Sequence, residues 1–281
     1  EAAKKLSFGS KRTMRVAQDL YEGIDVGPDG AVGLITYMRT DSTRVAESAA
    51  TQTRDYLRVL FGAEYLAEGV QLYGDGKAKN TQDAHESVRP TDPTRRPDDV
   101  RKYLSPDQFK LYQLIWQRFM ASQMAPAVFD TTTVDFDIAA KEQPNIGRRS
   151  YLFRSTGSII KFQGFLALYR EAREEGDSKA LEDEQALPVV EVGENVPVQS
   201  ITPSQHFTEP PPRFSEASLV KALEQYGIGR PSTYASIIST LVNREYVTLD
   251  KKRFQPTDVG RVVNKFLTEH FAHWVDYEFT A

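Results

Sequence analysis

The spacing of apolar residues predicts a helical first part, a strand-rich middle part and a second helical part along the chain. Apolar positions three and four apart predict helices over residues 11–22 and 43–61, and Asp41 or Ser42 can cap the second of them. Between these helices, a turn that contains glycine and proline precedes a short apolar run at 32–38, which is typical of a strand.

A polar stretch rich in glycine and proline occupies residues 73–98 and predicts a long surface loop. Residues 105–108 are Ser-Pro-Asp-Gln, in which the serine can cap a helix, the proline can take its first position and the glutamine can close a capping box. The apolar residues that follow at helical spacing predict one long helix, and Pro126 marks the end of this first domain.

Residues 127–202 have the composition of strands. Thr, Val and Phe predominate at 129–138, where apolar and polar residues alternate toward the end of the run. Residues 151–169 and 189–201 look like further strands, and a solvated acidic insert at 170–186 interrupts the segment. This part of the chain is therefore predicted to be rich in β-structure.

Residues 203–281 return to a helical pattern that includes one tight hairpin. Ser215 can cap a first helix, Pro231 can open a second, and Thr257 can cap a third, while two short strands flank residues 250–252. The order of helix, turn, helix and two-stranded ribbon is that of a winged-helix module.

The 281-residue chain is 40% apolar and 11% aromatic, which argues against a disordered protein. It contains no cysteine, which excludes a disulfide scaffold, a zinc–thiolate site and a thiol nucleophile. No run approaches the length of a membrane-spanning helix. Because the chain starts with Glu1 inside a helix-like stretch and stops abruptly at Ala281, we expect it to be an internal piece of a longer protein.

The net charge of −4 is unusual for a protein that binds nucleic acid, but the acidity is concentrated in one place. Residues 168–194 hold nine acidic residues against three basic ones, whereas residues 230–269 hold seven basic and four acidic residues. The total charge therefore excludes a uniformly basic surface and allows a local track for phosphates.

The sequence Ile-Thr-Tyr-Met-Arg-Thr-Asp-Ser-Thr at 35–43 places a tyrosine and an arginine at the end of the predicted strand. Strand alternation puts Tyr37 and Arg39 on one side and Met38 on the other, and the expected helix start adds unpaired N–H groups. A phenol, a guanidinium and a helix N-terminus together suit a phosphate, and the tyrosine could attack its phosphorus. The alternative is a purely structural tyrosine and arginine at a strand end.

Two other segments carry side chains suited to phosphate contact. His85 and Arg89 lie four residues apart ahead of a proline and could form a second contact, although an exposed loop turn is the simpler interpretation. Arg230, Ser232 and Thr233 lie at a predicted helix start that could face a backbone phosphate, although they could equally be a plain helix cap.

Other motifs give no support for a different chemistry. Residues 227–229 are Gly-Ile-Gly but lack the rest of a phosphate loop, and His270 and His273 lack a nearby third metal ligand. The Gly-x-Ser-x-Gly turn of one large class of hydrolases is absent.

Taken together, these segments resemble the bacterial type IA DNA topoisomerases. The resemblance runs through essentially the whole chain and rests on four motifs in the order of the family: ITYMRTDST at 35–43, AHESVRPT at 84–91, QHFTEPPPRFSEASLVKALE at 205–224 and GIGRPSTYASIIST at 227–240. Four such motifs in the same order make the resemblance specific.

The resemblance implies a role for each matching residue. Tyr37 would be the nucleophile that opens one DNA strand and becomes linked to its 5′ phosphate, and Arg39 would stabilise the scissile phosphate. His85 and Arg89 would contact the cleaved strand near the tyrosine. The residues implied to bind DNA are Thr40, Ser42, His85, Arg89, Arg230, Ser232, Thr233 and Arg244.

The activity implied by the resemblance is that of an isomerase, which cuts one strand, lets another strand pass and reseals the cut without ATP, so that negative supercoils relax. The partner would be DNA, single-stranded at the cleavage site, and the protein would be cytoplasmic and associated with the nucleoid. The toprim domain of the family, which supplies the ligands of Mg²⁺ and the general acid, is absent from this sequence. We therefore expect no metal site in this chain and no complete reaction cycle without that domain.

The implied fold is α+β and multidomain, with mainly helical, winged-helix-like (catabolite-activator-like) modules joined by a β-rich arch. Residues 1–126 would be the movable domain that carries the active tyrosine, 127–202 part of the arch or hinge, and 203–281 part of the base domain. The upstream half of the arch and the C-terminal repeats are also absent. The arch segment should therefore have exposed strand edges or be poorly ordered.

Two other classes of protein remain as alternatives. A non-catalytic DNA-binding protein would use 203–281 as a winged helix, but its recognition helix at 231–243 carries Ser236, Ser239 and Thr240 rather than the Arg, Asn and Gln that read base edges. A structural adaptor would explain none of the four motifs.

Overall fold

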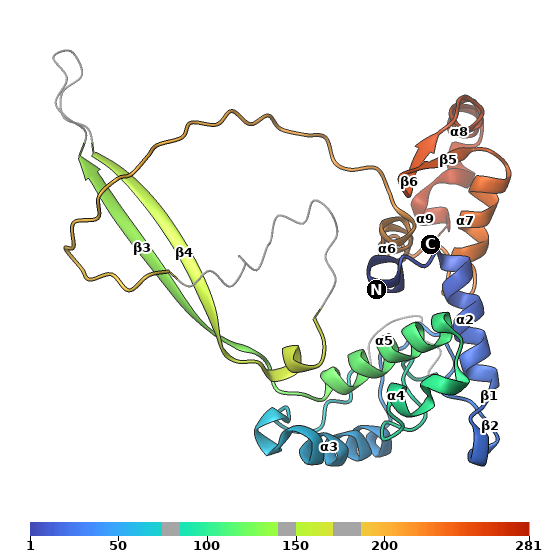
Figure 1. The fold of residues 1–281 in the computed structure, drawn as a ribbon. Coiled ribbons are helices and arrows are strands. Elements are labelled where there is room, and N and C mark those ends of the chain that lie inside the picture. The colour runs from blue at the N-terminus through green and yellow to red at the C-terminus, as the bar shows by residue number, and fades with distance from the viewer. Residues whose placement is uncertain (75–84, 140–149, 171–186, 281) are drawn as a thin grey trace. The chain divides into compact units, whose positions relative to one another are not determined.

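The computed structural model describes residues 1–74, 85–139, 150–170 and 187–280 (Figure 1), and its fold is α+β. The chain divides into two compact units. The first comprises Glu1–Ala125, Phe165–Glu174 and Pro212–Ala281, and the second comprises Pro126–Gly164 and Glu175–Pro211. The three-part division expected from the sequence stays a prediction. No helix in the described part of the chain combines the length and apolar character needed to cross a bilayer.

Helices that pack around α5 form most of the first unit. The helices of its N-terminal part are α1 (Ala2–Leu6), α2 (Ser10–Glu22), α3 (Glu47–Phe61), α4 (Pro97–Val100) and α5 (Pro106–Ser122). Helices α1, α2 and α4 each pack against α5. Their apolar faces meet in one core, in which Leu20, Leu57, Tyr112 and Met120 are completely buried. The helix predicted over 11–22 is confirmed as α2.

The start of α5 is the one that its local sequence predicts. The Ser105 hydroxyl accepts a hydrogen bond from the backbone N–H of Gln108 at 3.3 Å, and the Gln108 side chain accepts one from the N–H of Ser105 at 2.9 Å. Pro106 occupies the first helical position, where its missing N–H costs nothing. Four neighbouring residues therefore define this helix start without help from the rest of the fold.

The strand at 32–38 and the helix at 43–61 are both shorter than predicted. Strand β2 covers only Ala31–Val32 and pairs with β1 (Ile24–Asp25), while α3 begins at Glu47 and has no side-chain cap. The prediction that Asp41 or Ser42 caps this helix is wrong. Val45 is buried and its N–H donates to the carbonyl of Leu72 at 2.7 Å, so tertiary contacts use the backbone that a longer helix would need.

The loop predicted on the surface at 73–98 is partly a core element. Residues 75–84 lie outside the described residues, but Pro90 and Pro93 are among the most deeply buried residues of the chain. The indole N–H of Trp116 donates to the carbonyl of Pro93, and the Tyr112 hydroxyl donates to the carbonyl of Arg95, both at 2.8 Å. Pro90 and Pro93 have no backbone N–H that would need a partner when buried. Side chains of α5 supply hydrogen-bond donors for two carbonyls of this loop, which allows the loop to be buried.

A buried amide joins the end of α5 to the chain that follows α3. Gln123 is fully buried, and its side chain donates to the carbonyl of Gln71 at 2.7 Å and accepts from the N–H of Gln71 at 3.2 Å. The Gln123 side chain thus forms hydrogen bonds with both the N–H and the carbonyl of Gln71, as a neighbouring strand would.

The C-terminal part of the first unit has the order of elements predicted from the sequence. Its elements are α6 (Glu216–Gln225), α7 (Tyr234–Asn243), β5 (Val247–Asp250), β6 (Arg253–Pro256), α8 (Asp258–His270) and α9 (Tyr277–Thr280). The predicted caps Ser215 and Thr257 are confirmed, since their hydroxyls accept from the N–H groups of Ser218 and Gly260. The second helix starts at Tyr234 instead of Pro231, because residues 230–233 form a hydrogen-bonded turn.

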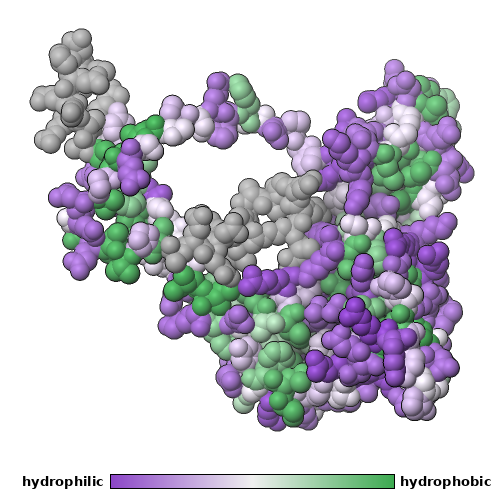
Figure 2. Space-filling view, viewed as in Figure 1, coloured by the Kyte–Doolittle hydropathy of each residue, from purple (hydrophilic) through white to green (hydrophobic). Residues whose placement is uncertain are grey.

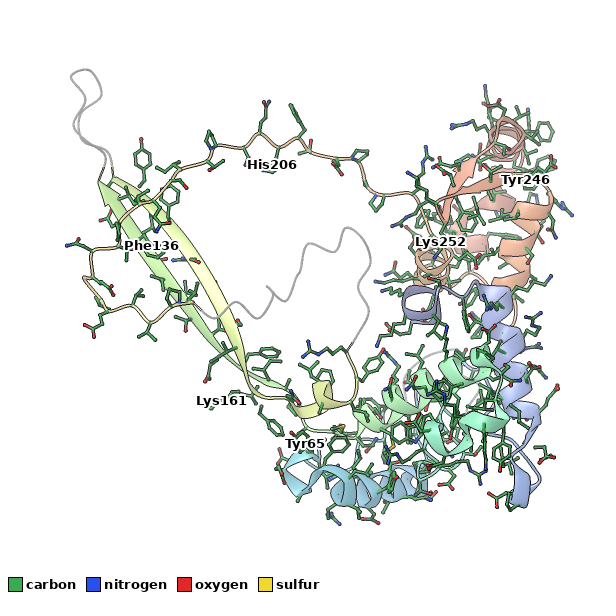
Figure 3. The ribbon with its side chains drawn as sticks, in the orientation of Figure 1. Tyr65, Phe136, Lys161, His206, Tyr246 and Lys252 are labelled. Atoms are coloured by element: carbon green, nitrogen blue, oxygen red, sulfur yellow. The ribbon has the colours of Figure 1, made fainter. Side chains whose placement is uncertain are left out.

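The predicted hairpin between the last helices is also confirmed. Strands β5 and β6 pair in antiparallel register, and Lys251 and Lys252 make the turn with φ angles of 45° and 63°. Lys252 also reaches back to the N-terminus, where its ammonium donates to the Ser7 hydroxyl at 3.0 Å (Figure 3). Apolar surface is visible over the α6–α8 segment (Figure 2), where Val259, Val262 and Phe266 are more than half exposed.

The second unit is built on one long hairpin. Strand β3 (Val128–Ala139) pairs in antiparallel register with β4 (Ser150–Phe162). Val134, Phe136 and Ile138 are half-buried on one face of β3, whereas the alternate residues Asp135 and Asp137 are exposed (Figure 3). The predicted alternation is confirmed. The strand predicted over 151–169 ends earlier, at Phe162, and a single 3₁₀ turn (Gly164–Ala167) follows it.

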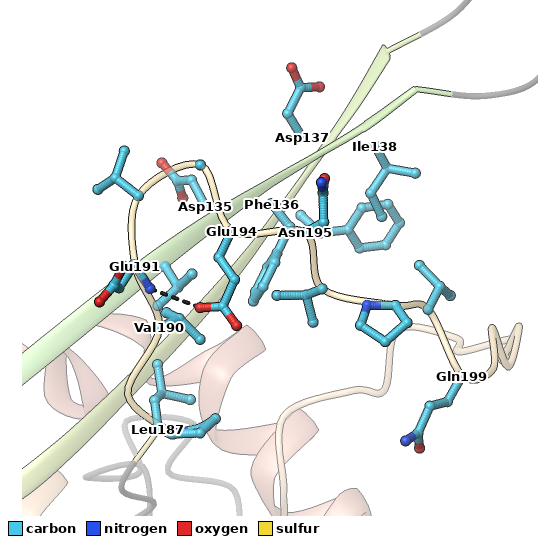
Figure 4. A pocket seen from close by; sticks show the side chains of 18 of the residues that line it. Asp135, Phe136, Asp137, Ile138, Leu187, Val190, Glu191, Glu194, Asn195 and Gln199 are labelled. Carbon is cyan, nitrogen blue, oxygen red and sulfur yellow. Dashed lines mark hydrogen bonds between the residues drawn. The ribbon is translucent and has the colours of Figure 1, made fainter.

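The strand predicted at 189–201 is wrong, because residues 187–214 form no regular element. This segment instead runs across the apolar face of the hairpin and encloses with it a cavity of ≈ 1240 Å³ (Figure 4). Its backbone makes a local turn in which the N–H of Glu191 donates to the Glu194 carboxylate at 2.9 Å. In the described residues β3 and β4 pair only with each other, so the expected exposed strand edges are confirmed.

We expect Ser105→Ala to lower the free energy of unfolding by about 1 kcal/mol, because the N–H of Gln108 loses its capping partner. Urea denaturation followed by the fluorescence of Trp116, which lies on the same helix, measures the change. Thr51→Ala, at an exposed position inside α3, is the matched control and should change stability by less than about 0.5 kcal/mol. Equal effects of the two substitutions would contradict the assigned cap.

We expect Gln123→Leu to cost about 2–3 kcal/mol, since it leaves the N–H and the carbonyl of Gln71 without their side-chain partner. Hydrogen exchange of the Gln71 amide should become much faster in this variant, whereas the amides inside α5 should keep their relative protection. Unchanged exchange at Gln71 would show that another group satisfies this backbone.

Candidate active site

Backbone pairing joins the first two sequence motifs, although about fifty residues separate them. Ile35 and Pro90 form an antiparallel bridge. On either side of it, the N–H of Thr91 donates to the carbonyl of Leu34 at 3.0 Å, and the N–H of Thr36 donates to the carbonyl of Arg89 at 2.9 Å. Leu34, Ile35 and Pro90 are buried, so the pairing is anchored in the core of the first unit.

The side chain of Thr36 adds two further bonds to the same pairing. Its hydroxyl donates to the carbonyl of Ser87 at 2.8 Å and accepts from the N–H of Arg89 at 3.0 Å. Thr36 therefore holds the segment 87–89 by three hydrogen bonds of its N–H and its hydroxyl, directly before Tyr37 in the chain. Our sequence reasoning missed this residue, because a threonine in a short apolar run carries no signal of a distant partner.

Tyr37 lies between two other rings in the structure. The ring of His85 stacks on it with a centroid distance of 5.5 Å and an interplanar angle of 30°. Tyr21, from the last turn of α2, meets the same ring edge-on at 5.3 Å and 65°. The tyrosine ring is half-buried, and no described residue forms a hydrogen bond with its hydroxyl. The two neighbours thus orient the phenol and leave its oxygen available.

The residues that follow Tyr37 point in different directions. Met38 is buried, whereas Arg39 is exposed and forms no hydrogen bond or ion pair with any residue in the described ranges. Its guanidinium is therefore available for an anion that approaches the tyrosine.

Sequence reasoning missed Tyr21, which is distant in the sequence and lies on a helix whose apolar pattern indicates only packing.

The helix N-terminus expected beside Tyr37 is not there, because α3 begins at Glu47. The intervening residues form tight turns instead: the Thr40 hydroxyl accepts from the N–H of Ser42 at 3.0 Å, and the Ser42 hydroxyl accepts from the N–H of Arg44 at 3.2 Å. The prediction that a helix dipole converges on Tyr37 and Arg39 is wrong. The phenol and the guanidinium remain as the groups of this candidate site that could act on an anion.

Arg89 is engaged by its own segment. Its Nε and Nη2 atoms donate to the two carboxylate oxygens of Glu86, each at 2.9 Å, and its Nη1 donates to the carbonyl of Pro90 at 2.9 Å. Its side chain is only 12% exposed. Glu86 was not among the residues that the sequence singled out, since acidic residues are common in loops.

The last motif forms an exposed turn before α7. The N–H of Arg230 donates to the Thr233 hydroxyl at 2.9 Å, and that hydroxyl donates to the carbonyl of Arg230 at 3.1 Å. Arg230, Ser232 and Thr233 are exposed, and so is Arg244 directly after α7. The four residues therefore offer two guanidiniums and two hydroxyls to solvent at the two ends of one helix.

Tyr234 begins α7 and is half-buried. Partial burial raises the pKa of Tyr234, the carboxylates of Glu224 and Asp41 raise it further, and the guanidinium of Arg230 lowers it. Hydrogen bonds and the bridge between Ile35 and Pro90 thus bring the first two motifs together, and a common site with the turn before α7 stays a prediction.

The described residues do not fit a metal site. Within the described ranges, no three His, Asp or Glu side chains come together in a way that could hold an ion. His270, the last residue of α8, packs against the ring of Phe266. His273, in the turn after α8, packs against the rings of Trp274 and Phe279. No step of the chemistry is therefore derived through a metal ion in this chain.

Comparisons with known proteins agree with these motifs. A family model described as DNA topoisomerase matches residues 1–281. The chain is 50% identical over all of its 281 residues to proteins named DNA topoisomerase 1 from two strains of Xylella fastidiosa, and it spans 33% of their length. A structure of full-length topoisomerase I from Thermotoga maritima matches the whole chain with a TM-score of 0.78 and 36% identity, and the match covers 42% of that chain. The chain therefore belongs to the bacterial type IA DNA topoisomerase family.

Proposed function

We propose that this chain is the tyrosine-bearing part of a longer type IA DNA topoisomerase, which relaxes negative supercoils by cutting and resealing one strand. The observation that carries the proposal is the oriented phenol of Tyr37, stacked on His85 with its hydroxyl available, beside the exposed guanidinium of Arg39. The chain spans about a third of the length of its Xylella relatives, so the complete activity belongs to the longer protein.

The proposed chemistry is a reversible exchange of ester bonds. The Tyr37 oxygen attacks the phosphorus of a backbone phosphodiester and forms a 5′-phosphotyrosyl bond, while the 3′ oxygen leaves with a proton as a free hydroxyl. Arg39 stabilises the negative charge that builds up on the phosphoryl oxygens. The reverse attack by the 3′ hydroxyl reseals the strand without ATP, after another strand has passed through the gap.

The other DNA contacts are proposed to be contacts to the backbone rather than to bases. Thr40 and Ser42 follow the tyrosine in the chain and His85 stacks on it, and these three residues would contact the strand near the cut. Arg230, Ser232, Thr233 and Arg244 would guide a single strand toward it. Cationic and hydroxyl side chains of this kind bind phosphate without reading sequence. Arg89, which the resemblance adds to this set, is already engaged by Glu86.

We also propose the domain roles that the resemblance implies. Residues 1–126 would move with the tyrosine, 127–202 would belong to the arch, and 203–281 would form a winged-helix-like part of the base. The succession of α6, α7, the β5–β6 hairpin and α8 supports the last role. The ligands of Mg²⁺ would come from the toprim domain of the longer protein, which would act in the cytoplasm at the nucleoid.

The alternative function, a DNA-binding protein without chemistry, is less well supported by α7. The hydroxyls of Ser236, Ser239 and Thr240 donate to carbonyls of their own helix or of the turn before it, at 2.8–2.9 Å. Hydroxyls used in this way are poor readers of base edges. Such a helix suits contact with DNA of any sequence.

We expect Tyr37→Phe to abolish the covalent adduct, because the attacking oxygen is removed while the ring contacts remain. The measurement uses the chain supplied with the toprim segment, Mg²⁺ and a single strand labelled at its 3′ end, downstream of the cleavage site, so that the label stays with the protein. Tyr103→Phe, at a half-buried tyrosine outside the ring group of Tyr21, Tyr37 and His85, is the control and should form normal adduct. An adduct in Tyr37→Phe would place the nucleophile elsewhere.

We expect Arg230→Ala to weaken single-strand binding equally for all sequences and to reduce the slope of log K against log salt by about 0.7, the value for one lost phosphate contact. Arg58→Ala, at an exposed arginine of α3, is the matched control. Affinity measured by fluorescence anisotropy at several salt concentrations gives both values. A loss that depends on sequence, with an unchanged slope, would contradict a phosphate contact.

A further inference from the structure

We propose that Glu86 and Arg89 are a positioning pair that holds His85 against Tyr37, and that Arg89 makes no contact with the DNA backbone. The inference rests on the proposed function, because it assigns how the nucleophile of that reaction is oriented. It assigns a role to Glu86, which neither the sequence motifs nor the comparisons single out, and it changes the role expected of Arg89.

The first argument is that all three nitrogens of the Arg89 guanidinium are already engaged within its own segment, which leaves only one N–H on Nη1 and one on Nη2. Nε and Nη2 form a two-pronged contact with both oxygens of Glu86, and Nη1 is used by the carbonyl of Pro90. The side chains of Arg89 and Glu86 are 12% and 26% exposed, so water screens this pair less than it screens a surface pair. A phosphate would have to displace the carboxylate and then lie close to its negative charge.

The second argument is the position of the pair in the chain. Glu86 directly follows His85, whose ring stacks on Tyr37, and the backbone of Arg89 is bonded in both directions to Thr36, which directly precedes Tyr37. The ion pair therefore closes a five-residue loop whose two ends lie against the nucleophile. Thr36 and the carbonyl of Arg44 already hold Ser87, and the ion pair adds a side-chain link from Glu86, the neighbour of His85, to the fixed end of that loop at Arg89.

The third argument is the contrast with Arg39. Arg39 is exposed and forms no ion pair with a described residue, whereas Arg89 and Glu86 together are electrically neutral. Arg39 is therefore suited to bind the phosphate, whereas Arg89 is suited to position the ring of His85. Arg–carboxylate pairs of two-pronged geometry are also the ones that fix orientation best.

A double-mutant cycle tests the inference in the full-length enzyme. Glu86→Gln, Arg89→Ala and the double variant are compared with wild type in single-turnover cleavage and in equilibrium binding of a labelled single strand. We expect each single variant to cleave about 10- to 100-fold more slowly, the range that a small misplacement of reacting groups produces. The double variant should be no slower than the worse single variant, and all three should bind DNA with a Kd within about twofold of wild type.

The control is a pair of the same spacing and order that lies away from the site. Asp55 and Arg58 of α3 are also three residues apart, and they are 66% and 58% exposed, with 3.3 Å between the charged atoms. Asp55→Asn and Arg58→Ala should leave cleavage unchanged. Arg89→Lys keeps the charge but loses the two-pronged contact, so it should cleave slowly and bind DNA normally even if Arg89→Ala fails to fold.

Different results overturn different statements. If Arg89→Ala and Arg89→Lys bind DNA more weakly with a smaller salt slope, while Glu86→Gln binds more tightly, Arg89 contacts phosphate and the positioning role is wrong. Additive losses of cleavage rate in the double variant would also overturn it. If wild type forms no adduct that depends on Tyr37, the proposed function and this inference both fail.

Discussion

The pairing of residues 34–36 with residues 89–91 is the constraint on which the candidate site depends. It joins two segments that the chain separates by about fifty residues, and the buried Ile35 and Pro90 keep it in the core. Thr36 strengthens it with backbone and hydroxyl bonds, so the residue before Tyr37 has little freedom. His85 stacks on Tyr37 directly beside this pairing, and the pairing fixes the backbone of Arg89.

Charge in this region is divided between groups that are already paired and groups that remain available. Glu86 and Arg89 neutralise each other in a half-buried position, whereas Arg39, Arg230 and Arg244 are exposed. Only the second kind can attract a polyanion without first losing an internal contact. A net charge of −4 is compatible with such a site. Salt screens exposed charges from one another beyond about one Debye length, roughly 10 Å in moderate salt, so acidic residues farther away than this have little effect on the electrostatic potential at the site.

The hairpin unit shows how strongly strand formation depends on a partner. Residues 189–201 have the apolar content of a strand, yet they lie across the face of β3 and β4 as irregular chain, and Val189 and Val192 are fully exposed. A strand needs a neighbouring strand for its backbone hydrogen bonds, and in the described residues β3 and β4 offer these only to each other. Two strands alone are marginally stable in water, which fits a piece that spans a third of its relatives' length.

The sequence by itself determined the elements whose signals are local and pointed to the candidate side chains of the site. The caps at Ser105, Ser215 and Thr257 and the turn at Lys251 involve partners a few residues away, so the local pattern was sufficient. Only the tertiary structure decided the start of α3, the burial of Pro90 and the pairing of residues 34–36 with residues 89–91. These outcomes depend on hydrogen bonds and packing between segments that are far apart in the sequence. Such contacts form only when the chain closes long loops around a common core, so no local pattern can reveal them.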